Sequence, residues 1–329
     1  MPGTAGAGDA RDPAPHLRRV SAHVGEVLDR FLAARRAAVA GIDESLPPLV
    51  DELAAVIGSG GKRVRPYLAC WGYRAAGREV DDAMIQAAAA LELLHTFALI
   101  QDDFMDASAV RRGRATTHAT MGAAAALLVS DAALVWADEL VVEAGFSPSR
   151  RLAAMRIFNA MRTEVTLGQY LDLFAPADEE HALKVNVYKT AGYTVLRPIQ
   201  YGLVLGGAPS GLVDAIPAYA EPAGVAFQLR DDVLGAFGNT TLTGKPAGDD
   251  LHQRKATWLW TRALRRAGDP PPGTPLADWV RSSGALDDTE ALIADLESQA
   301  RDALAQLPVA AALREELGRV TTMLVSRTR

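Results

Sequence analysis

The sequence contains one cysteine, Cys70, among its 329 residues. A single cysteine excludes an internal disulfide framework and suits a reducing compartment, so we predict an inert buried thiol in a cytoplasmic protein. There is no basic block and the net charge is −6, which argues against nucleic acid as a partner. No segment reaches about 18 uninterrupted apolar residues. The nearest, residues 121–136, is broken by Ser130 and Asp131, so we expect no membrane span.

Helical spacing of apolar residues is the dominant pattern. From residue 22 onward, apolar side chains recur every three or four residues, and the alternation typical of strands is scarce. Gly- and Pro-rich turns interrupt this pattern, but none divides the chain into independent halves. Residues 1–20 lack an apolar core, and we predict a disordered tail there. Residues 21–329 then form one all-α domain, a single large helical bundle around a deep central cavity.

Three carboxylates close a long apolar helix. The helix predicted over residues 84–107 contains no proline or glycine, and Asp102, Asp103 and Asp106 lie at its end. At about 100° per residue, Asp102 and Asp106 lie one turn apart on one face, and His95 falls close to the same stripe. Acids at a helix C-terminus oppose the helix dipole, so cations should lie nearby. The pattern predicts a divalent-metal rim at one end of an apolar shaft.

Basic and acidic segments elsewhere in the chain complement this cluster. The loop at residues 60–66 (GGKRVRP) combines glycines with three cations, which suits phosphate binding but is also typical of a solvated turn. The basic turn at residues 111–114 (RRGR) directly follows the acids and is the stronger signal. A second polar group lies in the last third of the chain and consists of Gln228, Asp231, Asp232, Lys245, Asp249 and Lys255.

Seven motifs, taken in order, resemble those of the trans-prenyl diphosphate synthases, the polyprenyl synthetase family. They are GGKRVRP, LELLHTFALIQDDFMD, RRGRATTH, GQYLDL, YKTAGYT, FQLRDDVLG and TGKPAGDDL. The resemblance covers about residues 25–329, which is all but the tail. It implies an all-α bundle around a central cavity, a homodimer, and a Mg²⁺-dependent prenyltransferase that joins isopentenyl diphosphate to an allylic diphosphate.

Carried over residue by residue, the resemblance implies roles for the matching positions. Three Mg²⁺ ions are expected with substrate bound, and their ligands would be Asp102, Asp106 and Asp231. The acids that act through water or through neighbouring contacts would be Asp103, Asp232 and Asp249. The groups that grip the allylic diphosphate would be Arg111, Lys189, Lys245 and Lys255. The groups that hold isopentenyl diphosphate would be Lys62, Arg65, His95 and Arg112.

The resemblance also implies which groups face the reacting carbon atoms. Thr190 and Gln228 would face the developing allylic cation, so the catalytic group comprises Lys189, Thr190, Gln228, Lys245 and Lys255. Further cavity-lining residues would be Gln169 and Tyr193. The sequence places Lys189 and Thr190 at the end of a helix that begins near Glu179.

This chain departs from the family pattern at several positions. The third acid of the second acid motif is replaced by Gly235, and an acid often found in the next Gly-Asp pair is replaced by Asn239. Ala115 and Gln101 stand where proline and histidine are frequent. Because the third acid is a weaker, often water-mediated metal contact, we expect altered Mg²⁺ affinity and not lost activity. An unchanged half-saturating Mg²⁺ concentration in a Gly235→Asp variant would contradict this expectation.

Product length should depend on the floor of the apolar shaft. The growing chain would extend from the Asp102 rim past Ala98, which is small, and Phe97, which is large. An aromatic residue with a small neighbour at these positions resembles the geranylgeranyl (C20) pattern of the family. Phe97 is also compatible with an ordinary core aromatic, and farnesyl (C15) and geranylfarnesyl (C25) products remain alternatives.

Two other functions share part of this pattern. A class I terpene cyclase has a similar metal site but needs no isopentenyl diphosphate pocket, so Lys62, Arg65, His95 and Arg112 argue against it. A catalytically silent partner subunit is suggested by Gly235 and Asn239. Such subunits usually lose the first acid motif or the phosphate-binding lysines, and this sequence retains both.

Overall fold

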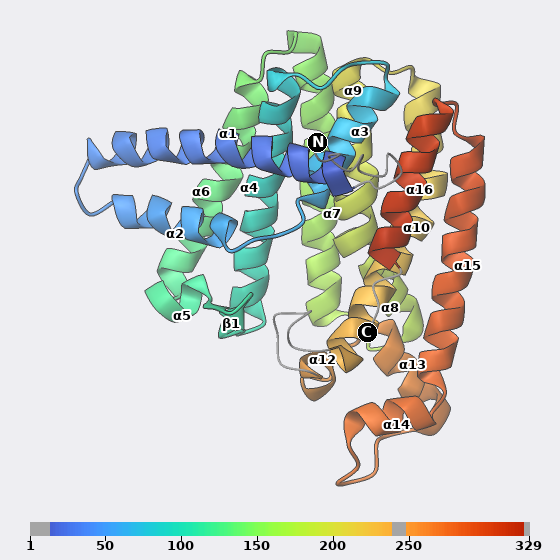
Figure 1. The fold of residues 1–329 in the computed structure, drawn as a ribbon. Helices are drawn as coiled ribbons and strands as arrows, with labels where there is room; N and C mark the ends of the chain where they lie inside the picture. The colour runs from blue at the N-terminus through green and yellow to red at the C-terminus, as the bar shows by residue number, and fades with distance from the viewer. Residues whose placement is uncertain (1–13, 239–247, 326–329) are drawn as a thin grey trace, which may run out of the picture.

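The computed structural model describes residues 14–238 and 248–325, and their regular structure is almost entirely helical (Figure 1). The helices, in chain order, are α1 (Ala14–Ala40), α2 (Pro47–Gly58), α3 (Val64–Ala75), α4 (Asp82–Met105), α5 (Thr117–Met121), α6 (Ala123–Glu143), α7 (Pro148–Phe174), α8 (Glu179–Val185), the π-helix η1 (Asn186–Leu196), α9 (Arg197–Gly206), α10 (Ser210–Phe237), α12 (Asp249–His252), α13 (Trp258–Ala267), α14 (Leu276–Ser282), α15 (Ala285–Gln306) and α16 (Ala311–Val325). The two strands are β1 (Val110–Arg111) and β2 (Arg114–Ala115), which form one antiparallel hairpin. The all-α prediction is confirmed. Residues 14–20, which the sequence assigns to a disordered tail, instead form the start of α1.

Helix α4 carries the first acid cluster and packs mainly against α6 and α3. Asp81 caps its N-terminus by accepting a hydrogen bond from the backbone N–H of Met84. Met84 and Leu91 are fully buried in the largest core cluster of the described residues. The helix begins and ends two residues earlier than predicted, which makes Asp106 its C-cap residue. The acids therefore lie in the last turn and at the cap of a helix anchored in the core.

The same helix is apolar over most of its length. Within the described residues, α4 is the one helix that could span a membrane by length and composition, with a mean hydropathy of 1.6. In this fold 61% of that apolar window is buried, and its neighbours are α6, α3 and α1. Such burial is typical of the core helix of a globular protein.

Helices α3 and α9 cross so closely that their backbones touch. A Cβ atom built on Gly202 of α9 would lie 1.8 Å from the backbone oxygen of Ala69 on α3. A Cβ atom built on Gly72 of α3 would lie 2.3 Å from the backbone oxygen of Ile199 on α9. Glycine is therefore required on both sides of the crossing. The crossing fixes α3, which begins beside the basic loop, against the segment that follows η1.

We expect Gly202→Ala to lower the free energy of unfolding by about 1–3 kcal/mol, because the added methyl group forces α3 and α9 apart. Chemical denaturation followed by circular dichroism would measure the change. Gly211→Ala in the first turn of α10 is the matched control, since a Cβ there meets nothing within 4 Å. Equal losses of stability in the two variants would contradict the role assigned to the crossing.

Candidate active site

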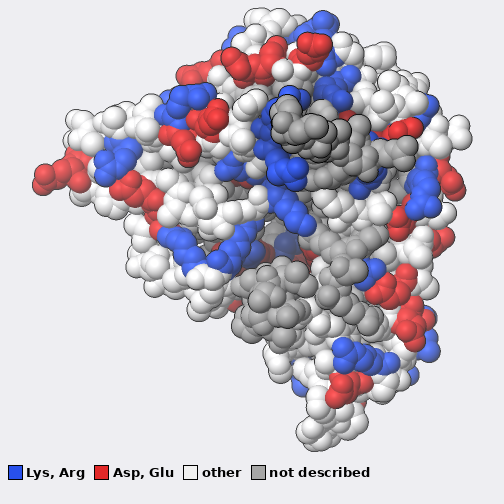
Figure 2. All heavy atoms as spheres, viewed as in Figure 1, with Lys and Arg blue, Asp and Glu red and all other residues white. Residues whose placement is uncertain are grey.

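One polar cavity collects side chains from segments that are far apart in the chain. It has a volume of about 560 Å³ and is bordered by the basic loop, α3, α4, the hairpin, α7, η1, α10 and the segment before α13. On the face drawn in Figure 2, Lys and Arg side chains gather toward the middle, whereas Asp and Glu lie mostly around the edges. The predicted residues that line the cavity are Lys62, Arg65, His95, Asp102, Arg111, Arg112, Lys189, Thr190, Gln228, Asp231, Asp232 and Lys255.

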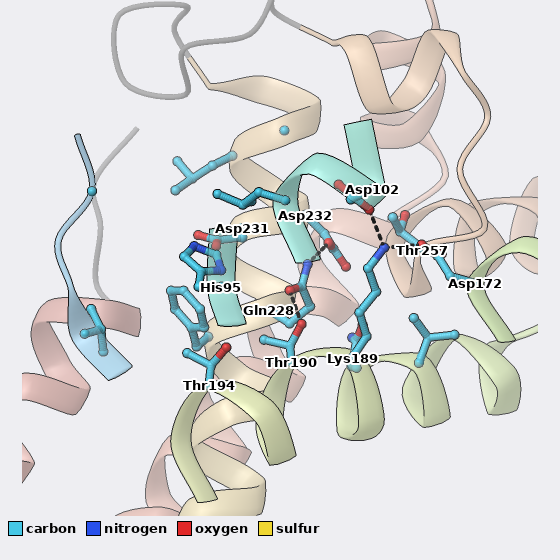
Figure 3. A pocket seen from close by; sticks show the side chains of 18 of the residues that line it. His95, Asp102, Asp172, Lys189, Thr190, Thr194, Gln228, Asp231, Asp232 and Thr257 are labelled. Carbon is cyan, nitrogen blue, oxygen red and sulfur yellow. Dashed lines mark hydrogen bonds and ion pairs between the residues drawn. The ribbon is translucent and has the colours of Figure 1, made fainter. Parts of the chain in front are cut away.

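Asp102 lies at the centre of an ion-pair network (Figure 3). Its carboxylate accepts hydrogen bonds from Lys189 Nζ at 3.0 Å and from Arg111 Nη2 at 2.8 Å. Lys189 Nζ also donates to Asp172 at 2.6 Å, and Arg111 Nε donates to Asp103 at 2.6 Å. The network joins two predicted diphosphate-binding cations, Lys189 and Arg111, to the predicted metal ligand Asp102.

Asp102 and Lys189 both keep their charges at neutral pH. Burial alone would raise the pKa of Asp102, but Lys189, Arg111 and Lys255 outweigh it and lower that pKa to about 2. Burial would lower the pKa of Lys189, but Asp102 and Asp172 raise it above its usual value. Asp102 is therefore an ionised carboxylate, and Lys189 is a permanent cation beside it.

The last acid of the cluster, Asp106, forms an ion pair with Lys255, which is distant in the sequence. Lys255 Nζ donates to Asp106 Oδ2 at 2.5 Å, although the two residues are 149 positions apart in the chain. Asp106 caps the C-terminus of α4, where its charge opposes the helix dipole. The cations expected near this helix end are therefore present as Lys255, Lys189 and Arg111.

Helix α10 supplies the facing wall of the cavity. Thr190 of η1 donates to the side-chain oxygen of Gln228 at 2.6 Å, and the Gln228 amide donates to Asp232 at 2.7 Å. These contacts are drawn in Figure 3, with Asp231 beside them. Gly235, one turn after Asp231, also lines the cavity. The position of the missing third acid thus belongs to the same wall as the acids that remain.

The basic turn after α4 is a tight two-residue β-turn. Val110 pairs with Ala115 and Arg111 pairs with Arg114, which leaves Arg112 and Gly113 as the loop. Both loop residues have positive φ, 51° and 73°, as two-residue hairpins with a primed turn require. The RRGR sequence therefore encodes a hairpin that places Arg111 beside the acids and Arg112 in the cavity wall.

Lys189 and Thr190 do not lie at the end of a helix, and that prediction is wrong. They lie inside η1, a π-helix that continues from α8 into α9 without a break. π-Helical segments are rare and often occur at functional sites, because the extra residue in a turn shifts side chains out of the α-helical register. The helix periodicity used for the sequence assumes an α-helix and could not detect this.

A second, more apolar cavity of about 380 Å³ adjoins the first. Phe97 and Ala98 of α4 line it, together with Gln169, Tyr170 and Tyr193. The residues that line both cavities are Arg65, His95, Leu99, Asp102, Lys189 and Thr190. The charged site therefore shares a wall with an apolar space, as the predicted shaft requires.

Some predicted residues lie elsewhere. Asp103 and Asp106 contact Arg111 and Lys255 but are not part of either cavity wall. Lys245, Asn239 and the side chain of Asp249 lie outside the described part of the chain.

The sequence analysis missed two acids that border the polar cavity. Asp172 binds Lys189, and Glu92 is buried beside the arginines of the basic segments. Asp172 belongs to the motif GQYLDL, and Glu92 belongs to the motif that begins LELLH. The motifs therefore included both acids, but the sequence did not indicate a role for either. Burial raises the pKa of Glu92, while Arg65, Arg63 and Arg112 oppose that rise.

The chemistry of these groups suits Mg²⁺. Asp102, Asp231 and Asp232 line the same cavity from two helices, and carboxylate oxygens are the ligands that this hard cation prefers. Among the described residues, no three His, Cys, Asp or Glu side chains are close enough to hold a metal ion by themselves. Mg²⁺ usually takes one or two carboxylates and completes its shell with water and substrate phosphates, so this donor set fits.

Comparison with known proteins identifies the family. A family model described as Polyprenyl synthetase matches residues 47–288. The chain belongs to the polyprenyl synthetase family. The family predicted from the seven motifs is therefore confirmed, as is the predicted enzyme class of this chain, a prenyltransferase of the trans-prenyl diphosphate synthase type.

The relatives that are similar to this chain are named for products of different chain length. A geranylfarnesyl diphosphate synthase from Aeropyrum pernix is 32% identical over 281 residues, which is 80% of this chain and 88% of that protein. A (2E,6E)-farnesyl diphosphate synthase from Mycobacterium tuberculosis is 36% identical over 243 residues, 72% of this chain and 66% of that protein. A crystal structure of geranylgeranyl pyrophosphate synthase from Corynebacterium glutamicum, complexed with isoprenyl diphosphate and magnesium, has a TM-score of 0.90 and 32% identity, covering 95% of this chain and 99% of that one.

Proposed function

We propose that this protein catalyses the Mg²⁺-dependent, head-to-tail condensation of isopentenyl diphosphate with an allylic diphosphate, releasing pyrophosphate. The observation that carries the proposal is the pair of adjoining cavities. One gathers acids and cations from segments spread over residues 61–257, and the other is lined largely by apolar side chains. They share Asp102, Lys189 and Thr190, so a diphosphate in the first would present its hydrocarbon chain to the second.

The proposed reaction begins with departure of pyrophosphate from the allylic substrate. Arg111, Lys189 and Lys255, with Lys245 outside the described residues, would hold the departing charge. Mg²⁺ ions, three with substrate bound and held by Asp102, Asp106 and Asp231, would supply Lewis-acid neutralisation of the same leaving group. Since Asp102 is ionised and Lys189 is charged at neutral pH, neither needs a proton transfer before substrate binds.

The allylic cation would then be attacked by the double bond of isopentenyl diphosphate. The Thr190 hydroxyl and the Gln228 side-chain oxygen would place partial negative charge near the cation, and the apolar cavity would keep water away from it. A new carbon–carbon bond forms, and the C2 proton passes to an oxygen of the departing pyrophosphate. Isopentenyl diphosphate itself would be held by Lys62, Arg65, His95 and Arg112, which all line the polar cavity.

The same geometry bears on the two alternative functions. A terpene cyclase has no use for Lys62, Arg65 and Arg112, which line this cavity. A silent subunit has no use for Lys189 and Lys255, which pair with the first acid cluster. A cytoplasmic location stays a prediction and rests on the single, buried Cys70.

We further propose that the protein is a homodimer formed through α6 and α7. Leu128, Val135 and Val142 lie seven residues apart on α6 and are 62%, 63% and 51% exposed. A seven-residue apolar repeat is the spacing with which one helix packs along another. Tyr170 and Phe174 of α7 are also exposed and line the apolar cavity, so a second copy would cover both stripes and close that cavity.

Incubation with Mg²⁺, isopentenyl diphosphate and each allylic starter in turn should yield elongated prenyl diphosphates, detected as alcohols by mass analysis after dephosphorylation. Lys189→Ala should reduce turnover about 100-fold or more, because it removes a cation from the leaving group. Lys184→Ala is the matched control, since Lys184 is an exposed lysine paired with Glu180 on α8. Hydrocarbon products formed without isopentenyl diphosphate would favour a cyclase, and no turnover with any starter would favour a silent subunit.

We propose geranylgeranyl diphosphate as the product, with Phe97 limiting chain growth, since Phe97 and Ala98 both line the apolar cavity. Phe97→Ala should lengthen the longest product by one or more isoprene units. Phe31→Ala is the control, because Phe31 packs against Trp136 on α6 and borders neither of these cavities. A product profile that does not change would leave Phe97 as a core aromatic only.

Val135→Glu should convert the proposed dimer to a monomer, because it places a charge inside the apolar stripe of α6. Sedimentation velocity at micromolar concentration would measure the change. Ile42→Glu, at an exposed position in the α1–α2 connection, should leave the assembly intact. A wild-type protein that sediments as a single chain would remove the dimer from the proposal.

A further inference from the structure

Tyr193 of η1 contacts two of the groups predicted to hold isopentenyl diphosphate. Its hydroxyl lies 3.1 Å from His95 Nδ1. Its ring lies beneath the guanidinium of Arg65, with 4.2 Å between Arg65 Cζ and the ring centroid. Tyr193 is 3% exposed, so both contacts are shielded from water. One side chain therefore joins α4, which carries His95, to α3, which carries Arg65.

The hydroxyl proton of Tyr193 determines which nitrogen of His95 carries a hydrogen. Burial raises the pKa of Tyr193 to about 12, so the hydroxyl keeps its proton at neutral pH. A buried hydroxyl must donate this proton to an acceptor, and among the described contacts of this hydroxyl the acceptor is His95 Nδ1. The imidazole therefore accepts at Nδ1 and carries its own proton at Nε2.

His95 is held in the neutral form by its surroundings. Burial lowers its pKa well below the usual value, and the charges of Arg65, Arg112 and Arg111 lower it further. The other titratable groups beside it are Tyr193, which stays protonated, and Glu92, which faces the same arginines. A neutral imidazole has one N–H to give, so its tautomer decides whether His95 can donate into the cavity.

Arg65 is oriented by two adjacent residues of η1. The Tyr193 ring supports the guanidinium plane, and Arg65 Nη2 donates to Thr194 Oγ1 at 2.7 Å. Arg65 Nε is buried and has no hydrogen-bond partner in the structure. The guanidinium is thus held at one edge and on one face, and it lines the polar cavity.

We propose that Tyr193 is the positioning residue of the isopentenyl diphosphate site. It fixes His95 as the neutral tautomer with hydrogen on Nε2, so that His95 donates to a diphosphate oxygen, while its ring and Thr194 aim Arg65 at the same diphosphate. The assignment rests on the proposed function for the identity of the ligand. The tautomer itself is a property of the protein without ligand.

The tautomer can be measured by NMR on the ligand-free protein labelled with ¹⁵N-histidine, using a His95→Gln variant to assign the signal. We expect an unprotonated Nδ1 and a protonated Nε2 in the wild type, and a mixture of tautomers in Tyr193→Phe, which lacks the hydroxyl. Tyr201→Phe is the matched control, since the Tyr201 hydroxyl is also buried but donates to Ala87 O, away from both cavities. A proton on Nδ1 in the wild type, or the same tautomer in Tyr193→Phe, would overturn the assignment.

Kinetics provide the second test. Tyr193→Phe should raise KM for isopentenyl diphosphate about 2- to 10-fold through loss of one hydrogen bond, and leave KM for the allylic diphosphate unchanged. Tyr193→Leu should raise it further, because the support beneath Arg65 is also lost. An equal rise in both KM values in Tyr193→Phe would show a general structural role and reject the proposal. A wild type without turnover would reject the proposed function, while the NMR result would still decide the tautomer.

Discussion

The position of η1 between α7 and α10 is the constraint on which the site depends. A Cβ atom on Gly168 of α7 would lie 2.5 Å from the backbone nitrogen of Lys189, and one on Gly224 of α10 would lie 2.4 Å from Ala191 Cα. The π-helix can therefore occupy this position only because both neighbours lack side chains there. Since its backbone is fixed on two sides, Lys189 reaches α4 and Thr190 reaches α10 from one rigid wall.

Charge balance is the second constraint, and it follows from the first. Lys189 pairs with both Asp102 and Asp172, and Arg111 pairs with both Asp102 and Asp103. Leaving any of these buried charges unpaired would be costly. A magnesium diphosphate brings charge of both signs, so it can exchange partners with the acids and the cations together. Binding of either component alone would leave part of the network without a partner.

The sequence predicted the helical class, the acid rim and its need for cations, because all three follow from local periodicity and the helix dipole. Asp102 and the RRGR turn are close in the chain, so their contact could be anticipated. That Lys255 is the partner of Asp106 could not be derived from spacing, because the pair is 149 residues apart and depends on the fold of the whole bundle. The π-helix was missed because a pattern of apolar residues read at α-helical spacing does not distinguish it from an α-helix.

Gly235 stands where the family pattern has a third acid, and its place in the cavity wall formed by α10 shows what this replacement affects. Gly235 lines the polar cavity next to Asp231, and Asp232 is held by the Gln228 amide. A missing carboxylate at this position removes a contact that water can replace, since Mg²⁺ retains several waters in most protein sites. The described cations that would take the leaving group include Lys189 and Lys255, and both contact the first acid cluster. Under the proposed function, the substitution would therefore change how tightly metal is held and would leave Lys189 and Lys255 in place to neutralise the diphosphate.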